Sequence, residues 1–264
     1  MSYITRWESY QRGANISRQT IELRRYHIDR IEPDTECSVL ELSLDDLLLV
    51  VGNPDWSPAT RRSYRATLRA FFSWAVAGGL VSESPAHKLP PVRVPRGMPR
   101  PATDAEYAAA MMAADERQML ELRLGNDCGL RRAEIARVRP EDVTGDLTGW
   151  SLRVTGKGGH VRVVPMPDDL AQLVLAAGPG WVFPSPHRAT HLTPAHLGKI
   201  VSRLFPDGVA THVLRHRAGA RAYAGTRDLR AVQEFLGHAK PETTAIYTQV
   251  PAASIRAVMQ AAAA

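Results

Sequence analysis

The sequence predicts an α+β multidomain protein, in which an all-helical domain precedes a mainly helical domain with a small antiparallel β-hairpin. Three observations predict this fold. Apolar residues recur at helical spacing in the first part of the chain. A stretch with six prolines at 84–103 has almost no apolar periodicity. Helical segments resume after it, around two alternating apolar runs that flank a glycine-rich turn. We therefore expect a first domain at 1–90, a linker at 91–103 and a second domain at 104–264.

The first domain is expected to contain three helices. Apolar spacing predicts one at 17–31 and a shorter one at 40–50, with Ser43 as its N-cap. The clearest lies at 60–77, where aromatic and aliphatic residues recur one turn apart until the Gly78-Gly79 pair ends the run.

Three arginines lie on the other side of that last helix, one turn apart: Arg61, Arg65 and Arg69. A charged stripe of this kind is most often a solvated face. Three cations without an acidic residue in the same turns also suit a surface that follows phosphates. The sequence leaves these two interpretations equally open.

The proline-rich stretch is expected to be extended and semi-rigid, as interdomain linkers are. It contains Lys88, Arg93, Arg96 and Arg100, for which no acidic partner is expected nearby. We hypothesise that this basic linker between the two domains lies along a polyanion.

The second domain is expected to alternate helices with one hairpin. Alternating apolar residues at 150–154 and 161–165 flank Gly156-Lys157-Gly158-Gly159 and predict two paired strands. Helices are predicted at 104–113, 116–127, 131–138, 168–176, 193–204, 211–223, 228–236 and 241–248, with a last one from Pro251 onward.

The charge, the length of the apolar runs and the cysteine content narrow the class of protein. The net charge of +6 is spread evenly: 14 basic against 11 acidic residues up to residue 100, and 19 against 16 beyond it. This fits a protein that grips a polyanion with several surfaces, although many other proteins are as basic. No apolar run is long enough to span a bilayer, and the polar N-terminus does not resemble a signal peptide. We expect a cytoplasmic protein, in a bacterial cell or a phage-infected host, whose Cys37 and Cys128 are reduced and partly buried.

Four motifs follow one another in the second domain: GlyLeuArgArgAlaGlu at 129–134, GlyLysGlyGly at 156–159, HisValLeuArgHis at 212–216, and LeuGlyHis at 236–238 followed by Tyr247. In this order and spacing they resemble the tyrosine recombinase (phage integrase) family, in its short form without an arm-binding domain. The resemblance covers residues 104–250. It implies a catalytic domain there and, less specifically, a helical core-type DNA-binding domain before it.

The resemblance assigns a phosphate clamp to Arg131 and Arg215 and makes Tyr247 the nucleophile. Arginine suits a clamp because its planar guanidinium donates two parallel hydrogen bonds to phosphate oxygens. A free phenol has a pKa of about 10, so Tyr247 needs a proton acceptor. His212 lies one helical turn before Arg215 and is the expected general base.

Three further positions match the family pattern. Lys157, at the tip of the hairpin, is the expected general acid for the departing 5′ oxygen, a task that arginine would perform poorly. His238 is expected to donate a hydrogen bond to the phosphate. Glu134, one turn after Arg131, is expected to orient that arginine, and His216 to support the site.

Each motif alone has a simpler explanation: an intrahelical ion pair for Arg131 and Glu134, a tight turn at Gly156, a half-buried core side chain for Tyr247. A metal site at His212, His216 and His238 is not favoured, because no carboxylate or cysteine lies at ligand spacing. We expect no metal and no cofactor. The simpler explanations do not account for the order and spacing of the motifs together.

The resemblance implies a site-specific recombinase that cleaves and rejoins DNA through a 3′-phosphotyrosyl intermediate. The expected partner is double-stranded DNA with inverted core sites, and the expected assembly is a homotetramer in synapsis, with a monomer or weak oligomer when free. No membrane partner is expected. Residues 251–263 form an amphipathic pattern that could cover the chain's own core or dock on a neighbouring subunit. Two alternatives remain: a type IB topoisomerase-like DNA-relaxing enzyme, and a non-catalytic DNA-binding protein of the same fold.

Overall fold

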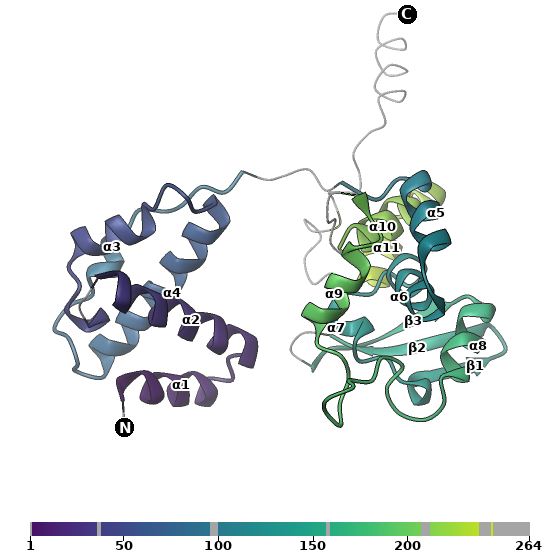
Figure 1. The fold of residues 1–264 in the computed structure, drawn as a ribbon, viewed down its shortest axis with the longest axis horizontal. Coiled ribbons are helices and arrows are strands. Elements are labelled where there is room, and N and C mark those ends of the chain that lie inside the picture. The colour runs from purple at the N-terminus through teal and green to yellow at the C-terminus, as the bar shows by residue number, and fades with distance from the viewer. Residues whose placement is uncertain are drawn as a thin grey trace, which may run out of the picture. The chain divides into compact units, whose positions relative to one another are not determined.

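The chain divides into two compact units, Met1–Gly97 and Met98–Ala264. The structure, a computed structural model, describes residues 2–35, 38–95, 100–156, 159–206 and 212–237, together with Thr244. Figure 1 shows helices in both units and a small sheet in the second. No helix in this described part of the chain is both long and apolar enough to cross a bilayer.

The first unit is all-helical, as predicted. The three predicted helices are present, and a fourth, α1, precedes them. Its elements are α1 (Tyr3–Gly13), α2 (Arg18–Thr35), the 3-10 helix η1 (Val39–Glu41), α3 (Leu44–Val51), α4 (Pro58–Ala77) and the 3-10 helix η2 (Pro85–Lys88).

Local signals explain where these helices begin and end. Ser43 caps α3 through a reciprocal pair of bonds with Asp46, which satisfies two backbone N–H groups at the helix start. Ser57 caps α4, and Pro58 follows at a position where a missing N–H costs nothing. Gly78 closes α4 with backbone bonds to Trp74 and Val76. The predicted cap and stop signals at Ser43 and Gly78 are thus confirmed.

The core of the first unit forms around α4. Leu68, Phe71 and Phe72 are completely buried, and the Trp7 ring of α1 meets the Phe71 ring edge-on at 5.1 Å between centroids. Tilted or edge-on ring pairs of this kind add to the free energy gained from burying the rings. The helix α1, which the sequence analysis did not predict, is therefore part of the core.

The start of the proline-rich stretch is not extended, contrary to expectation. Residues 85–88 form a 3-10 helix, and Ala86 and Leu89 are buried against the first unit's core. The expectation that the linker cations lack an acidic partner is also wrong for Arg100, which forms an ion pair with Glu106. The buried side chains of Ala86 and Leu89 thus hold the start of the proline-rich stretch on the first unit.

The second unit combines helices with a three-stranded sheet. Its elements are α5 (Asp104–Ala113), α6 (Glu116–Asn126), α7 (Arg132–Ile135), the 3-10 helix η3 (Pro140–Asp142), β1 (Val143–Asp146), β2 (Gly149–Thr155), β3 (Val161–Met166), α8 (Asp168–Ala176), α9 (Pro194–Ser202), α10 (His212–Thr226) and α11 (Leu229–Leu236). The helix predicted at 131–138 is much shorter: after Ile135 the chain continues in tight turns, and the Val138 carbonyl accepts the N–H of Val182. The helices predicted beyond 237 lie outside the described residues, except for the helical Thr244.

The predicted hairpin is confirmed as β2 and β3, with Trp150 opposite Met166 and Thr155 opposite Val161. A third strand, β1, pairs antiparallel to β2 and was not predicted, so the sheet order is β1-β2-β3. Only Val143 of β1 is buried, which leaves no alternating pattern for the sequence analysis to detect.

The inner face of this sheet packs into the larger core of the second unit. Leu152, Val154 and Val164 lie in one apolar cluster with Leu170 and Val174 of α8, and Figure 1 shows α8 beside the strands. Cys128 lies in the same cluster as a free thiol, as expected, but it is fully buried. Burial raises the pKa of Cys128 to about 12, so this thiol is inert. Cys37 lies outside the described residues.

Candidate active site

Two adjacent carbonyl groups at the end of α11 bring the predicted clamp arginines together. Arg215, on α10, donates from Nη2 to the Leu236 carbonyl at 2.5 Å and from Nη1 to the Gly129 carbonyl at 2.6 Å. Arg131, just before α7, donates from Nη2 to the Gly237 carbonyl at 3.1 Å. Carbonyls at a helix C-terminus carry partial negative charge, which suits two cations. The fold thus places both guanidinium groups at the same helix end.

The two arginines differ in exposure. Arg215 is only 1% exposed, so its carbonyl partners fix it from within the protein. The Arg131 side chain is 38% exposed and can be reached from solvent. A guanidinium group has five N–H donors, and the hydrogen bonds to protein described for Arg131 use two of them. An anion that approaches Arg131 therefore meets donors already held in one orientation.

Two glycines allow this arrangement. Gly237 has φ +64° and closes α11, and a Cβ there would lie 2.7 Å from Cδ of Arg162. Gly129 has φ +59°, and a Cβ there would lie 2.7 Å from a side-chain carbon of Leu236. Only glycine adopts the left-handed conformation at little cost and also fits these spaces. The GlyLeuArg and LeuGlyHis motifs are therefore in contact, which explains the glycine in each.

Glu134 holds Arg131 from a second side. Its carboxylate accepts the backbone N–H of Arg131 at 2.8 Å and the Arg131 Nη1 at 2.9 Å, as the predicted supporting role requires. Burial by itself would raise the pKa of Glu134. The hydrogen bonds from Arg162 and Arg131 outweigh that effect and lower the pKa to about 2, so Glu134 is ionised at neutral pH.

Arg162, on β3, is a part of the site that the sequence analysis missed. It donates from Nη1 and Nη2 to the two oxygens of Glu134, both at 2.9 Å. One signal for it exists in the sequence: an arginine stands in an otherwise apolar strand, five residues after Lys157. The sequence alone does not show which acidic residue it meets.

His212 and His216 lie one turn apart at the start of α10, with ring centroids 4.5 Å apart. Burial lowers the pKa of His212 below its ordinary value, and the nearby charges of Arg215, Arg131 and Arg132 lower it further. Burial, with smaller effects of His212 and Arg215, lowers the pKa of His216 to about 4. Both rings are therefore neutral at pH 7, and a neutral imidazole can accept a proton.

Lys157, His238 and Tyr247 lie outside the described residues. The described neighbours of Lys157 and His238, Gly156 and Gly237, belong to the same cluster. A Cβ on Gly156 would lie 3.5 Å from Oε1 of Glu134, and Gly237 accepts a bond from Arg131. In the part of the chain that the structure describes, no cluster of histidine, cysteine and acidic side chains could hold a metal ion.

The arginine stripe of the first unit contacts the protein's own backbone. Arg61 donates to the Asn53 carbonyl at 3.1 Å, Arg65 to the Leu89 carbonyl at 2.8 Å, and Arg69 to the His87 carbonyl at 2.8 Å. The bonds from Arg65 and Arg69 hold the turn at 85–89 on α4, and the bond from Arg61 holds the loop before α4. Contact of these three arginines with DNA stays a prediction, as does contact by the exposed Arg93; Arg96 lies outside the described residues.

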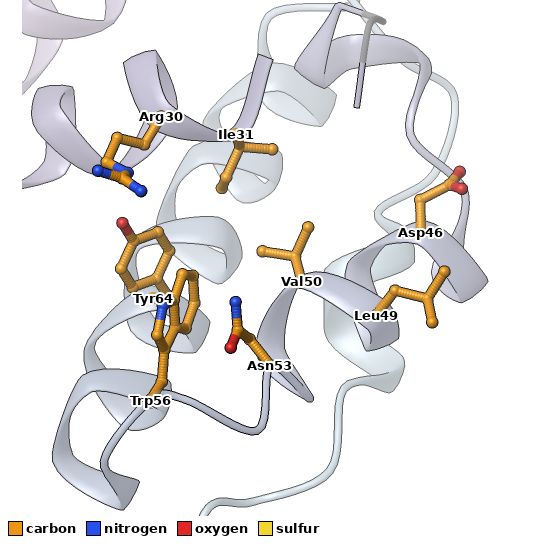
Figure 2. A pocket seen from close by; sticks show the side chains of 8 residues that line it. All are labelled: Arg30, Ile31, Asp46, Leu49, Val50, Asn53, Trp56 and Tyr64. Carbon is orange, nitrogen blue, oxygen red and sulfur yellow. The ribbon is translucent and has the colours of Figure 1, made fainter. Parts of the chain in front are cut away.

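A cavity of about 540 Å³ lies in the first unit and contains none of the predicted site residues (Figure 2). Its lining joins apolar side chains of α3 to Trp56 and Tyr64, whose ring centroids are 3.9 Å apart, with Arg30 beside them. It therefore belongs to the packing of α2, α3 and α4 and not to the arginine cluster.

Comparison with known proteins places the chain in a family. Residues 102–253 match the model of the phage integrase family. The tyrosine recombinase XerC of Rhizobium meliloti is 34% identical over 212 residues, which cover 72% of this chain and 66% of that protein. The tyrosine recombinase XerC of Rhodospirillum centenum is 30% identical, and the match covers 97% of this chain and 84% of that protein.

A solved structure supports the fold independently. The lambda integrase fragment 75–356, solved as a dimer bound to a COC′ core site, superposes with a TM-score of 0.68 at 17% identity. The superposition covers 90% of this chain and 94% of that one. The family model, the two recombinase relatives and this shared fold all agree: the chain belongs to the phage integrase family and is a site-specific tyrosine recombinase.

Proposed function

We propose that this protein cleaves and rejoins double-stranded DNA at specific sites through a 3′-phosphotyrosyl intermediate, with Tyr247 as the nucleophile. One observation carries the proposal: Arg131 and Arg215, from distant parts of the chain, bond to the adjacent carbonyls of Gly237 and Leu236. Two guanidinium groups held at one helix end place positive charge beside a bound phosphodiester, whose non-bridging oxygens gain negative charge during transfer.

The first proton transfer is assigned to His212. As the Tyr247 oxygen forms its bond to phosphorus, the phenolic proton passes to the neutral imidazole of His212. The lowered pKa of His212 supports this assignment, because the ring is in its proton-accepting form at neutral pH. His216, whose pKa is also lowered, packs against His212 and limits the orientations of that ring.

The second proton transfer is assigned to Lys157. The bond between phosphorus and the 5′ oxygen breaks, and Lys157 protonates that oxygen to leave a free 5′ hydroxyl. His238 donates a hydrogen bond to the phosphate during both steps. The reverse sequence, with the 5′ hydroxyl of another strand as the attacking group, rejoins the DNA. The phosphotyrosyl bond conserves the phosphodiester, so strand exchange needs no nucleotide cofactor.

The proposed substrate is DNA with inverted core sites, exchanged within a homotetramer that assembles from monomers or weak oligomers. Names of relatives support the DNA partner: both XerC proteins are tyrosine recombinases, and the lambda integrase fragment was solved on a core site. They favour strand exchange over a topoisomerase-like relaxing activity or a non-catalytic role. We place the activity in the bacterial cytoplasm, where such DNA would be found.

The proposal is tested by covalent trapping on nicked DNA taken from the region around the protein's own gene. A nick beside the cleavage point lets a short fragment diffuse away, so the covalent complex accumulates. We expect a denaturant-resistant protein–DNA adduct with the wild-type protein and none with Tyr247→Phe, which lacks only the hydroxyl. An adduct formed equally by both proteins would show that another residue is the nucleophile. Site-specific binding without an adduct in either protein would favour the non-catalytic alternative.

A further inference from the structure

Arg162 shares its carboxylate partner with a clamp arginine. Glu134 accepts two bonds from the Arg162 guanidinium, each 2.9 Å, and also holds Arg131 through its backbone N–H and its Nη1. Both members of the strand-to-helix pair are largely buried, with side chains 15% exposed for Arg162 and 4% for Glu134. The carboxylate therefore lies between a buried arginine from β3 and the more exposed arginine of the clamp.

The Arg162 side chain also packs against Gly237. A Cβ on Gly237 would lie 2.7 Å from Cδ, 3.0 Å from Nε and 3.2 Å from Cζ of Arg162, so this side chain fills the space that a larger residue would need. The Gly237 carbonyl in turn accepts from Nη2 of Arg131 at 3.1 Å. Arg131, Glu134, Arg162 and Gly237 thus form a closed ring of contacts that joins α7, β3 and the end of α11.

We propose that Arg162 is a positioning residue for DNA cleavage, which acts through Glu134 and Gly237 to hold the Arg131 guanidinium in one orientation toward the scissile phosphate. This inference rests on the proposed function. Arg162 does not donate a proton in this role and need not touch DNA. It fixes the two groups, one carboxylate and one carbonyl, from which Arg131 is held.

The geometry indicates why arginine is needed at this position. Arg131 is a long and partly exposed side chain, which would lose its preferred orientation if Glu134 rotated. A guanidinium binds both carboxylate oxygens in one plane and so prevents that rotation, whereas an ammonium group binds as a point charge. Residues that orient the ligands of a metal ion in this way typically change metal affinity or activity by about 10–100-fold when they are mutated, and we expect an effect of the same order here.

The test compares Arg162→Gln and Arg162→Lys with wild type in single-turnover adduct formation at saturating protein on the nicked substrate. We expect adduct formation to slow by roughly 10–100-fold in Arg162→Gln and by less in Arg162→Lys, with little change in DNA affinity. Arg153→Gln is the matched control. Arg153 lies on the neighbouring strand, is largely exposed, and donates its described side-chain hydrogen bonds to Asp142 and not to Glu134. Wild-type rates are expected for this control.

A second substrate separates the proposed role from an effect on Lys157. If sulfur replaces the 5′ bridging oxygen, the leaving thiolate needs no proton. A defect that acts through Arg131 persists on this substrate, so Arg162→Gln should remain slow relative to wild type. Restoration of the wild-type rate by sulfur would show that Arg162 acts on leaving-group protonation, and it would overturn the inference.

The variant Glu134→Gln tests the route through the carboxylate. We expect Arg162→Gln to add little further loss when Glu134 is already replaced, since both changes break the same contact. Wild-type cleavage by Arg162→Gln, or two fully multiplicative losses, would contradict the inference. If Arg162→Gln does not fold, which thermal unfolding would show, Arg162→Lys is used in the same comparisons. Absence of an adduct with wild-type protein would instead defeat the proposed function, and the role of Arg162 with it.

Discussion

At the scale of single residues, the surroundings of His212 decide when it can accept a proton. Burial and three neighbouring arginines disfavour its charged form and lower its pKa below the ordinary value of 6.5. A general base is active when deprotonated, so in the proposed role of His212 the active fraction rises as pH rises through this lowered pKa. The DNA-free protein therefore holds His212 ready to act at neutral pH.

We predict that adduct formation measured at low protein concentration, which reports the free enzyme, falls only below pH 6.5. His212→Gln should reduce the rate by roughly 10²–10⁴-fold and should also remove this acid limb, because glutamine does not titrate. The measurement is the initial rate of adduct formation between pH 5 and 8 in both proteins. An acid limb that persists unchanged in His212→Gln would assign the titration to a different group.

The sequence identified several residues that meet in the structure, but it did not identify all of their contacts. The spacing of motifs selected Arg131, Arg215 and Glu134, and the structure brings these three together. Arg162 and the carbonyls of Leu236 and Gly237 were not predicted. A main-chain carbonyl has no residue type to recognise, and the partner of a strand arginine depends on how β3 packs against α7. Such contacts are tertiary, and no local pattern encodes them.

At the scale of elements, helices and strands are predicted correctly where their caps and their apolar spacing are clear in the sequence. The bounds of α5 and α8 agree with the predicted ranges, because Thr103 caps α5 and apolar residues recur along both helices. The helix α1 was missed because one of its three buried positions is a glutamine, Gln11, beside Ile4 and Trp7. The strand β1 was missed because it buries a single residue. Elements stabilised mainly by their neighbours leave weak sequence signals.

The packing of α2 on α4 contains a pH-sensitive contact. His27 is buried, lies 2.8 Å from the Thr67 hydroxyl and stacks on the Tyr64 ring. Burial lowers its pKa to about 4. The unfolded state then binds more protons than the folded state between about pH 6.5 and 4, so stability is present above this window and is lost as pH falls through it.

We predict that the unfolding free energy drops by on the order of 1–3 kcal/mol from pH 7 to pH 4 through this one residue. His27→Gln keeps a side chain that can bond to Thr67 but does not titrate, so its stability should depend less on pH in this range. Urea unfolding of both proteins at several pH values measures the difference. Equal pH dependence in wild type and variant would mean that His27 is not the responsible group.

At the scale of the whole molecule, the described parts of the proposed cleavage site lie in one unit, while the positive charge is shared by both. Arg131, Arg162, His212 and Arg215 all belong to Met98–Ala264, and each part of the chain carries a net charge of +3 when divided at residue 100. In the proposed mechanism, the second unit alone supplies the residues that hold the phosphate of one strand. Strand exchange requires more, because two duplexes must be held together.

Residues 251–263 are the segment whose sequence best suits that additional task. Ile255, Val258 and Met259 recur at helical spacing in a short stretch that follows Tyr247 and contains none of the predicted catalytic residues. We predict that a protein truncated after Val250 still forms the adduct on a single nicked site at a rate close to wild type. The same protein should fail to assemble higher-order complexes on two duplexes.

Native gels and light scattering on DNA with paired inverted sites measure assembly, and the nicked substrate measures cleavage in parallel. As a matched control, Ile255→Ala with Met259→Ala in the full-length chain removes apolar surface without shortening it, and should weaken assembly in the same direction. A truncated protein that assembles normally would show that this segment covers its own subunit. Loss of cleavage together with assembly would show instead that the segment supports the position of Tyr247, since a single site needs no second duplex.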